Sequence, residues 1–348
     1  MKQNYPELEL IKETNKSQKK IYQPSSFWEK ASSKIHQEII NEGIANFRKL
    51  PTPLSFFVPN YGIPTNSFSN EISKELLNLI KKNGSEKQNL AMEEFLSGYF
   101  HALSDYRVFL ASNDENKKPF LNHFSESTYG NPLEQFEFDG KKYSRSSLNY
   151  IQGLCFLKSF IEKDEIKTVL EIGGGFGSLG EILKYSEDIK YIDIDIPPMS
   201  FITWKYLENI YGNENIEPYG QNKNEIFIEN IERCAVLNSW DIEKLNGEID
   251  LFVNFVSFQE MEPHIVENYL THVKRLNPKW VLLRNMREGK QIKKSRGVGV
   301  EVPIKKGAYL EMLEDKYIRI ATNVFPYGYK TVDGFHSELY LFKRISKK

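Results

Sequence analysis

The sequence predicts an α/β fold, in which a doubly wound, mostly parallel, Rossmann-like sheet follows a mainly helical N-terminal region. Three observations support this prediction: strand and helix patterns that alternate after about residue 143, a glycine-rich loop after the first buried strand, and two strand patterns that close the chain. We therefore expect a helical N-terminal or cap region over residues 1–143 and the sheet domain over residues 144–348. With 348 residues and 40% hydrophobic content, the chain is long enough for both.

The N-terminal region has two parts. Residues 1–25 are polar and carry several lysines, so we expect a loosely held arm with no catalytic residues. Helical periodicity follows over residues 26–110 and is clearest over residues 92–110. A turn-rich segment over residues 113–142 then leads to the sheet domain. An aromatic stripe in the helical part is expected to lie in the core: Phe95, Tyr99, Phe100, Tyr106 and Phe109.

Strand and helix patterns alternate through the sheet domain, as in a series of βαβ units. We expect helices over residues 146–162, 178–186, 199–211, 263–275 and 308–314. We expect strands over residues 168–172, 190–196, 235–238, 249–254, 280–283, 317–325 and 337–344. A loop that contains proline and glycine joins the last two strands, which predicts an antiparallel hairpin at the end of the parallel sheet.

A glycine-rich loop follows the first strand of this domain. Residues 169–172 form a buried strand pattern, and Gly173, Gly175 and Gly177 allow the backbone to turn sharply beneath a ligand. A helix begins directly afterwards, and free N–H groups at a helix start favour ligand contact. The motif therefore predicts a cofactor that resembles a nucleotide.

Two cofactors fit this loop. Residues 175–180 match the G-x-G-x-x-G pattern of dinucleotide sites, with Asp195 twenty residues beyond Gly175. Glu171 instead favours S-adenosyl-L-methionine (SAM), because a carboxylate inside an apolar strand needs a positive or hydrogen-bonding partner. The ammonium group of SAM is such a partner, whereas a pyrophosphate would be repelled. We predict SAM, with NAD and a purely structural turn as alternatives.

Further candidates for the cofactor site follow the next strands. Asp193 and Asp195 end the second strand and point the same way, so one is expected to bind the ribose hydroxyls while the other holds a loop. We favour Asp195 for the ribose. After the third strand, three residues are candidates to contact adenine, with a simple turn as the alternative: Ser239, Trp240 and Asp241.

The fourth strand ends at Asn254, beside the position where a methyl group must be presented. Methylases of exocyclic base amines usually carry Asn/Asp-Pro-Pro-Tyr/Phe there. This sequence does not, which counts against methylation of adenine or cytosine. Gln259, Glu260 and His264 follow at the mouth of the expected crevice.

Three segments, residues 169–177, 191–198 and 257–261, together resemble the sugar O-methyltransferases of bacterial surface-glycan clusters. These are class I SAM-dependent methyltransferases, and the resemblance covers roughly residues 131–343. It implies SAM as methyl donor and a sugar hydroxyl as acceptor, in polysaccharide or glycoconjugate biosynthesis. Spacing and composition do not indicate the sugar. The resemblance places four residues at the SAM site, Glu171, Gly173, Gly175 and Asp195, and two on the acceptor side, Gln259 and Glu260.

A sugar hydroxyl is a poor nucleophile, so a general base is expected near it. His264 is the preferred candidate because it follows the fourth strand, Glu260 competes with it, and His336 precedes the last strand. A surface or packed position is the alternative interpretation for each histidine. No H-E-x-x-H pattern occurs, and we predict no metal.

A basic segment follows the fifth strand and predicts contact with phosphate, as in a nucleotide sugar or a lipid-linked glycan. A solvated loop is the alternative. The basic residues are Arg284, Arg287, Lys290, Lys293, Lys294, Arg296, Lys305 and Lys306.

Composition limits the partners and the compartment. A net charge of -1 gives no general attraction to nucleic acid or anionic membranes. No apolar run approaches the ~18 residues that a membrane span needs. Cys155 and Cys234 have no partner spacing and suit free thiols in a reducing compartment, so we expect a cytoplasmic protein. A homo-oligomer, an RNA or other small-molecule methyltransferase, and a non-catalytic SAM-binding interaction protein all stay open.

Overall fold

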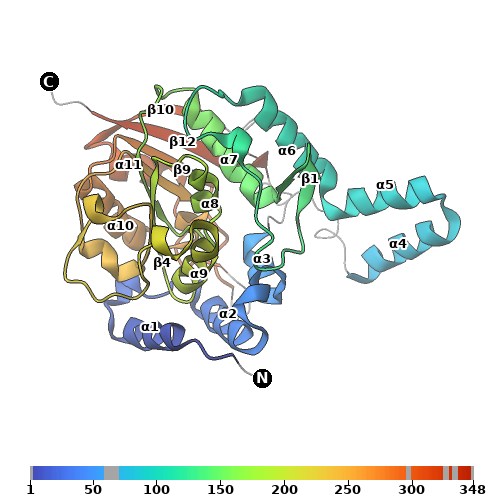
Figure 1. Ribbon diagram of the computed structural model, residues 1–348, viewed down its shortest axis with the longest axis horizontal. Helices are drawn as coiled ribbons and strands as arrows, with labels where there is room; N and C mark the ends of the chain where they lie inside the picture. Colours follow the sequence, from blue (N-terminus) through green and yellow to red (C-terminus); the bar gives the residue numbers. More distant parts are fainter. Residues whose placement is uncertain (1–2, 59–69, 295–298, 324–328, 331–335, 346–348) are drawn as a thin grey trace.

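The protein is built around one large sheet with helices on both sides (Figure 1). The structure, a computed structural model, describes residues 3–58, 70–294, 299–323, 329–330 and 336–345. No helix in these ranges is long and apolar enough to cross a bilayer.

The strand order of the central sheet is β10-β12-β9-β8-β3-β4-β6, and β11 pairs with β12 at its edge. Five strands are parallel: β6 (Cys234–Asn238), β4 (Lys190–Asp195), β3 (Thr168–Ile172), β8 (Leu251–Phe255) and β9 (Trp280–Met286). The closing strands are β10 (Tyr317–Asn323), β11 (Tyr329–Lys330) and β12 (His336–Arg344). β12 runs antiparallel to both β9 and β10, which confirms the predicted terminal hairpin.

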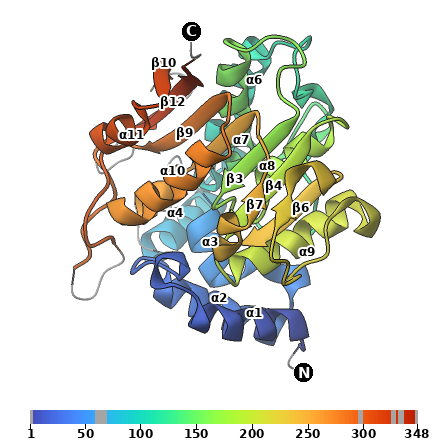
Figure 2. The same cartoon turned by 90° about the vertical axis from the view of Figure 1, so that its left-hand side faces the viewer.

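Helices cover both faces of this sheet because the chain leaves β3 in two directions. The units β3-α8-β4 and β4-α9-β6 step one way, and β8-α10-β9 steps the other way. Right-handed crossovers therefore put α8 and α9 on one face and α10 on the opposite face (Figure 2). The helices of this domain are α7 (Arg145–Lys158), α8 (Ser178–Lys184), α9 (Met199–Tyr211), α10 (Pro263–Arg275) and α11 (Lys306–Leu313).

The central strands form where the sequence is almost continuously apolar. Every residue of β8 is buried, as are the last four residues of β3, because helices cover both faces of a parallel sheet. Glu171 is the charged exception in β3. The helices begin at recognisable signals: Ser144 and Ser147 form a capping box at α7, and Pro263 occupies the first turn of α10. The predicted α/β fold is therefore confirmed.

The N-terminal region is mainly helical, as expected. Its helices are α1 (Pro6–Ser17), α2 (Glu29–Glu42), α3 (Pro51–Phe57), α4 (Asn70–Asn83), α5 (Glu86–Ser97) and α6 (Tyr99–Ser112), followed by the hairpin β1 (Phe136–Phe138) and β2 (Lys141–Tyr143). The shorter elements of the chain are η1 (Lys20–Tyr22), η2 (Ile44–Lys49), η4 (Leu121–His123), η5 (Asn213–Asn215), η6 (Ile228–Asn230), η7 (Ser239–Glu243), η8 (Ser257–Glu260), β5 (Ile226–Phe227) and β7 (Leu245–Asn246).

The start of the chain is not a loosely held arm, so that prediction is wrong. Residues 6–17 form α1, whose Leu8 and Ile11 lie one turn apart and are both buried. Tyr22 is also buried, against the sheet domain. A helix with a largely polar sequence can pack against the protein when two apolar residues at helical spacing face a complementary surface.

The aromatic stripe is only partly in the core. Tyr106 and Phe109 are buried and pack against Tyr143, as predicted. Phe95 is 47% exposed on α5, which projects away from the body of the protein (Figure 1), and Phe100 is 47% exposed in the first turn of α6. One continuous hydrophobic core includes residues of the N-terminal region and of the sheet domain.

Candidate cofactor site

The glycine loop after β3 is shaped for close approach by a ligand. Gly173, Gly175 and Gly177 have φ values of 73°, 68° and 98°, which favour glycine over residues with a side chain. A Cβ atom on Gly173 would overlap the Oγ atom of Ser257. The Gly173 N–H donates to the Ile194 carbonyl at 2.8 Å, which ties the loop to β4. The loop is therefore a rigid cradle of bare backbone.

A pocket lies against this cradle. Its volume is about 550 Å³, which includes space open to solvent. Gly173 and Gly175 form one wall, and Asp195 lies at the carboxyl end of β4. Apolar side chains supply most of the remaining surface: Ile172, Ile194, Ile196, Met199, Met261, Ile265 and Tyr269. An apolar slot with a few fixed polar groups is the usual form of a cofactor site.

Asp193 and Asp195 both accept N–H groups of the glycine loop, and Asp195 also lines the pocket. The Asp193 Oδ1 atom accepts the Gly174 N–H at 3.1 Å, so this fully buried carboxyl group holds the loop. Asp195 lines the pocket and accepts the N–H groups of Gly175 at 3.3 Å and Ile196 at 2.7 Å. Burial raises the pKa of Asp195 to about 8. Burial and the neighbouring Asp195 also raise the pKa of Asp193 well above its ordinary value.

Glu171 has partners that the sequence reasoning missed. The Tyr150 and Tyr191 hydroxyls donate to its two carboxylate oxygens at 2.8 and 2.6 Å. Burial raises the pKa of Glu171 to about 7, and the two hydroxyl groups act in the opposite direction. Glu171 therefore does not need a bound ammonium group to satisfy its oxygens, because Tyr150 on α7 and Tyr191 on β4 do so.

The three candidates for adenine contact lie outside the residues that line the pocket. The Ser239 hydroxyl donates to the Tyr22 carbonyl at 2.6 Å. The Asp241 carboxylate accepts the Asn238 N–H at 3.2 Å and pairs with Lys244 at 2.9 Å. Trp240 is 6% exposed. These residues hold the turn after β6 and attach it to the N-terminal region.

The side chain of Asn254 also forms hydrogen bonds to other residues of the protein and does not line the pocket. Its side-chain amide donates to the Ile172 carbonyl at 2.8 Å and to the Ser257 Oγ atom at 2.6 Å. Its oxygen accepts the Phe258 N–H at 3.2 Å. Ser257 lines the pocket, so Asn254 positions a pocket residue that the sequence analysis did not identify.

Glu260, the first of the expected catalytic residues, is engaged by two other side chains. Its carboxylate accepts the Trp28 indole N–H at 3.0 Å and pairs with the Lys290 ammonium at 3.1 Å. Gln259, expected on the acceptor side, accepts the Met286 N–H at 2.7 Å through its side-chain oxygen. Neither residue is among those that line the pocket.

The two candidate histidines do not complete the site. His264 is exposed at the start of α10, and it is the next residue, Ile265, that faces the pocket. His336 begins β12, and its side chain lies outside the described residues. Nor does the described part of the chain contain a group of three or more His, Cys, Asp or Glu side chains that could hold a metal.

A segment that crosses the pocket from the N-terminal region is the main feature that the sequence analysis missed. We call residues 19–28 the N-terminal strap. Ile21, Gln23, Ser25 and Trp28 of the strap line the pocket together with the glycine loop. The sequence carries no local motif there.

Polar contacts attach the N-terminal strap to the sheet domain at both ends. At one end, the Tyr22 hydroxyl donates to the Glu243 carboxylate at 2.8 Å, and Lys19 pairs with the same carboxylate at 2.7 Å. At the other end, the Ser25 hydroxyl donates to the Glu260 carbonyl at 3.0 Å, and the Ser26 hydroxyl donates to Glu262 at 3.1 Å. The N-terminal strap therefore covers part of the pocket and is attached to the sheet domain at both of its ends.

The basic segment is less available for phosphate than its sequence suggests. Arg287 and Lys306 pair with the buried Glu338 at 2.8 and 2.9 Å, and Lys290 pairs with Glu260. Arg284 is 1% exposed and donates to the Asn149 carbonyl. Arg296 lies outside the described residues. The exposed cations of the segment are Lys293, Lys294 and Lys305.

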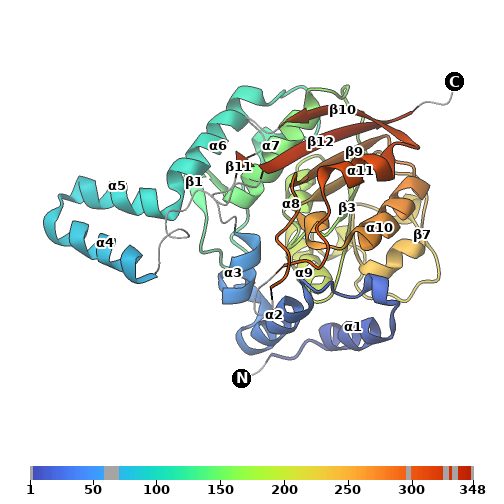
Figure 3. The same ribbon diagram turned by 180° about the vertical axis from the view of Figure 1, so that it is seen from behind.

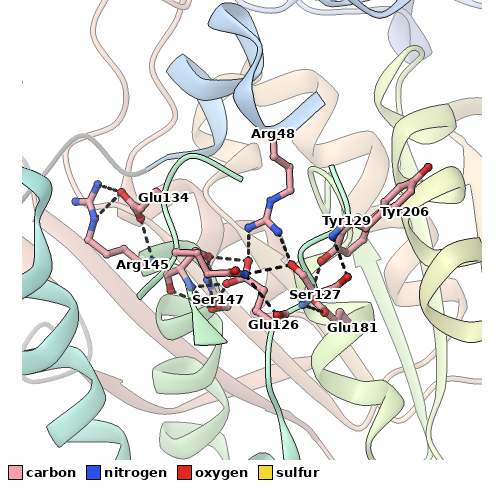
Figure 4. A network of polar contacts seen from close by, with 11 residues as sticks. Arg48, Glu126, Ser127, Tyr129, Glu134, Arg145, Ser147, Glu181 and Tyr206 are labelled. Atoms are coloured by element: carbon pink, nitrogen blue, oxygen red, sulfur yellow. Dashed lines mark hydrogen bonds and ion pairs between the residues drawn. The ribbon is translucent and has the colours of Figure 1, made fainter. Parts of the chain in front are cut away.

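A buried polar network joins Arg48 of η2 to residues 126–127 and to Glu181 of α8 (Figure 4). The Arg48 guanidinium pairs with Glu126 and donates to the Ser127 carbonyl at 3.0 Å. Glu181 accepts the Ser127 N–H at 2.6 Å and the Tyr206 hydroxyl at 2.7 Å. Burial and the nearby Glu126 carboxylate raise the pKa of Glu181 to about 8.

This network supports a second pocket, of about 330 Å³ including open space. Arg48, Glu134, Ser144 and Ser146 contribute polar groups to its lining, beside the rings of Phe57 and Phe176. Phe57 also lies against Gly175, at ordinary contact distance from the position of an added Cβ atom. The second pocket and the cofactor pocket therefore share the glycine loop as a wall.

The order and direction of the strands in the central sheet define the fold class of the protein. Five parallel strands carry the glycine loop after β3 and an acid at the end of β4, and β12 lies antiparallel between β9 and β10. This is a Rossmann-like α/β fold with an antiparallel closing strand.

Comparisons with known proteins give similarities of fold. No protein-family model matches the chain, and no curated protein matches it. Solved structures do match. A SAM-dependent methyltransferase from Aquifex aeolicus has 19% identity and a TM-score of 0.35, with 55% of this chain and 89% of that chain covered.

Two further structures are similar over the same share of the chain. Magnesium protoporphyrin IX methyltransferase from Synechocystis PCC 6803, with bound SAM, has 13% identity and a TM-score of 0.37, covering 56% of this chain and 77% of that chain. The 1,6-didemethyltoxoflavin-N1-methyltransferase from Burkholderia thailandensis has 13% identity and a TM-score of 0.39, covering 57% and 78%.

Proposed function

We propose that the protein binds SAM and transfers its methyl group to a hydroxyl of a sugar. The observation that carries the proposal is the pocket between the glycine loop and Asp195, in a Rossmann-like sheet with an antiparallel closing strand. A Cβ atom at Gly173 would overlap Ser257, so the close approach of the glycine loop to Ser257 depends on this glycine. SAM would supply an electrophilic methyl group on its sulfonium centre.

The residues of the pocket fit the parts of SAM. Gly173 and Gly175 would lie beneath the methionine part, and the Asp195 carboxylate would accept the ribose hydroxyls. Ile196 and Met199 would cover a face of adenine. In this assignment the loops around the cofactor are supported by the hydrogen bonds described above, which involve Glu171, Asp193, Ser239, Asp241 and Asn254. Trp240 is buried beside them.

The charge of the site favours SAM over NAD. Three carboxyl groups, those of Glu171, Asp193 and Asp195, lie close together. Glu171 raises the pKa of both aspartates, and Asp195 raises that of Asp193. With a pKa of about 8, Asp195 is mostly protonated at neutral pH. A bound sulfonium cation would lower this pKa and favour the carboxylate, whereas the pyrophosphate of NAD would raise it further. The cluster thus supports the choice that Glu171 alone suggested.

The second pocket supports an acceptor with C–H groups on the faces of a ring. A guanidinium, a carboxylate and two serine hydroxyls surround it, and the rings of Phe57 and Phe176 offer flat apolar faces. Arg48 and Ser144 are hydrogen-bonded to Glu126, and Glu134 is hydrogen-bonded to Arg145. The faces of the Phe57 and Phe176 rings would pack against the C–H groups of a sugar ring. The sugar itself rests on the sequence resemblance. The exposed lysines of the basic segment would contact phosphate on a nucleotide sugar or lipid-linked glycan.

We assign positioning roles rather than a general base. Glu260 holds the Trp28 indole over the pocket, and His264 lies on an exposed helix surface. Catalysis would therefore depend mainly on holding the acceptor oxygen in line with the methyl group while the N-terminal strap excludes water.

The donor is tested by thermal unfolding with saturating SAM, S-adenosylhomocysteine or NAD. Ligand at ~100 times its dissociation constant stabilises a protein by about 2.7 kcal/mol, which raises the melting temperature visibly. We expect a rise with both SAM compounds and none with NAD. The Asp195→Asn variant should lose most of the rise, and Glu187→Gln, at an exposed position, should keep it. A rise with NAD alone would make the protein a dehydrogenase candidate.

The acceptor is tested by transfer of a labelled methyl group from SAM to nucleotide sugars and lipid-linked glycans, with RNA as a comparison. A methylated sugar supports the proposal. Methylated RNA in its place supports an RNA methyltransferase. SAM binding without any methylated product supports a non-catalytic SAM-binding protein.

A further inference from the structure

Helices α4 and α5 form a hairpin that extends away from the body of the protein (Figures 1 and 3). The two helices pack against each other, and α5 continues into α6 through Gly98. The hairpin contributes nothing to either pocket described above.

The hairpin exposes large apolar side chains. Ile72 and Leu79 of α4 are 47% and 60% exposed, and Leu90 and Phe95 of α5 are 58% and 47% exposed. Among the hairpin side chains that the structure describes, only Leu96 is buried. Isolated helices shorter than ~12–15 residues are marginal in water, so such a hairpin needs a further surface against which to pack. Ile72 and Leu79 lie seven residues apart and therefore on one face of α4, and exposed apolar side chains that share a face mark an interaction site.

Charges are distributed unevenly along the hairpin. Its tip carries Lys81, Lys82 and Lys87 against one glutamate, Glu86. Its base carries three glutamates, Glu71, Glu75 and Glu94, against Lys74, while Glu93 pairs with Lys81 of the tip at 3.4 Å within the same hairpin. The tip is therefore net positive and the base is net negative.

This distribution is complementary to a second copy of itself. Two hairpins that lie antiparallel about a two-fold axis place each basic tip on the acidic base of the other, with the apolar side chains between them. Nucleic acid or an anionic membrane would match the tip alone and would be repelled by the base. This one arrangement buries the exposed apolar side chains and also places opposite charges next to each other.

We propose that the α4–α5 hairpin is a dimerisation surface that binds the same hairpin of a second copy of this chain in a four-helix bundle. The proposal does not depend on the proposed methyltransferase activity, because the hairpin is remote from both pockets.

The apolar contact is tested by sedimentation of the full chain over a range of concentrations. We expect a dimer for the wild type and a monomer for the double variant Leu79→Asp, Leu90→Asp. Leu110→Asp changes a leucine that is 54% exposed on α6 and should leave the dimer intact. Circular dichroism checks that each variant is folded. A wild-type monomer at all concentrations, or dissociation by Leu110→Asp as well, would overturn the proposal.

Charge reversal tests the antiparallel pairing. A tip-reversed chain, Lys82→Glu with Lys87→Glu, has acidic residues at both ends of the hairpin. A base-reversed chain, Glu75→Lys with Glu94→Lys, has basic residues at both ends. We expect each variant alone to be monomeric and an equal mixture to form a mixed dimer. If each variant alone still forms a dimer, or if the mixture stays monomeric, the antiparallel pairing is wrong.

Discussion

Gly173 combines two constraints at a single residue. Its φ of 73° is unfavourable for a residue with a side chain, and a Cβ atom would overlap Ser257. The cradle therefore depends on this glycine for both conformation and space.

The variant Gly173→Ala should lose the rise in melting temperature that SAM causes, because Ser257 or the loop must move. A left-handed conformation costs an ordinary residue roughly 1–2 kcal/mol, so the ligand-free protein should also melt somewhat earlier. Gly307→Ala is the control, since an added Cβ atom there meets nothing within 4 Å. Undiminished SAM binding by Gly173→Ala would show that the cofactor does not lie on this loop.

Glu181 makes the stability of the protein depend on pH. Its pKa is about 8, against 4.5 for an ordinary glutamate, so the folded state binds more protons than the unfolded state between these pH values. The free energy of unfolding should therefore fall as the pH rises through this window. Glutamine carries no charge, keeps the acceptor for the Ser127 N–H, and can donate its amide to the Tyr206 hydroxyl.

We expect Glu181→Gln to be more stable than the wild type at alkaline pH, with a difference that shrinks as the pH falls toward 4.5. Urea unfolding at several pH values measures this difference. Glu187→Gln, an exposed control, should show no such trend. A constant difference across the pH range would mean that Glu181 is ionised throughout.

At the residue scale, the sequence predicted the position of the glycine loop better than it predicted the roles of single side chains. The placement of Asp195 and Gly173 in the pocket follows from strand ends and glycine spacing, which are local signals. The partners of Glu171 could not be predicted, because Tyr150 and Tyr191 come from different elements. The same holds for Glu260, which pairs with Trp28 and Lys290 from distant parts of the chain.

The N-terminal strap is the largest part of the pocket lining that the sequence analysis did not predict. It contributes side chains to the pocket, yet its anchors are residues of the sheet domain. Release of a bound cofactor should therefore require the strap to lift.

Tyr22→Phe removes one anchor of the strap without changing the pocket lining. The Tyr22 hydroxyl contacts Glu243 at 2.8 Å and His272 at 3.1 Å. One such hydrogen bond contributes about 0.5–1.5 kcal/mol, so SAM should dissociate roughly threefold to tenfold faster, as measured by stopped-flow fluorescence. Tyr106→Phe removes a similar hydroxyl contact, to Asp139 at 2.7 Å, and should not change the rate. Equal rates for both variants would mean that the strap is not a gate.

The elements of the sheet domain were predictable because their signals are local. Buried parallel strands such as β3 and β8 are apolar runs, and α10 begins at a proline and ends near basic residues. The strap was not predictable. Its hydrogen bonds join residues more than 200 positions apart, and its own sequence is polar.

For the whole molecule, the core and the hairpin should differ in stability. The central strands are buried on both faces, whereas the hairpin is supported by its own packing and by α6. Local opening should therefore be far easier in α4 and α5 than in the sheet.

Hydrogen exchange can combine this contrast with the proposed dimer. Amides of α4 and α5 should exchange more slowly at high protein concentration than at low concentration, because the dimer buries them. Amides of β3, β4 and β8 should exchange slowly at both. Exchange in the hairpin that does not depend on concentration would contradict self-association.

The strap also has a consequence for synthesis of the chain. Tyr22 is translated 250 residues before His272, one of its partners. At about 5–20 residues per second, the ribosome needs roughly 10 to 50 seconds to produce that partner after the strap has emerged. During this interval the N-terminal strap has been synthesised, but the later parts of the sheet domain that complete the pocket have not. A newborn chain can therefore enclose a ligand only late in translation, once its earliest and its much later segments have met.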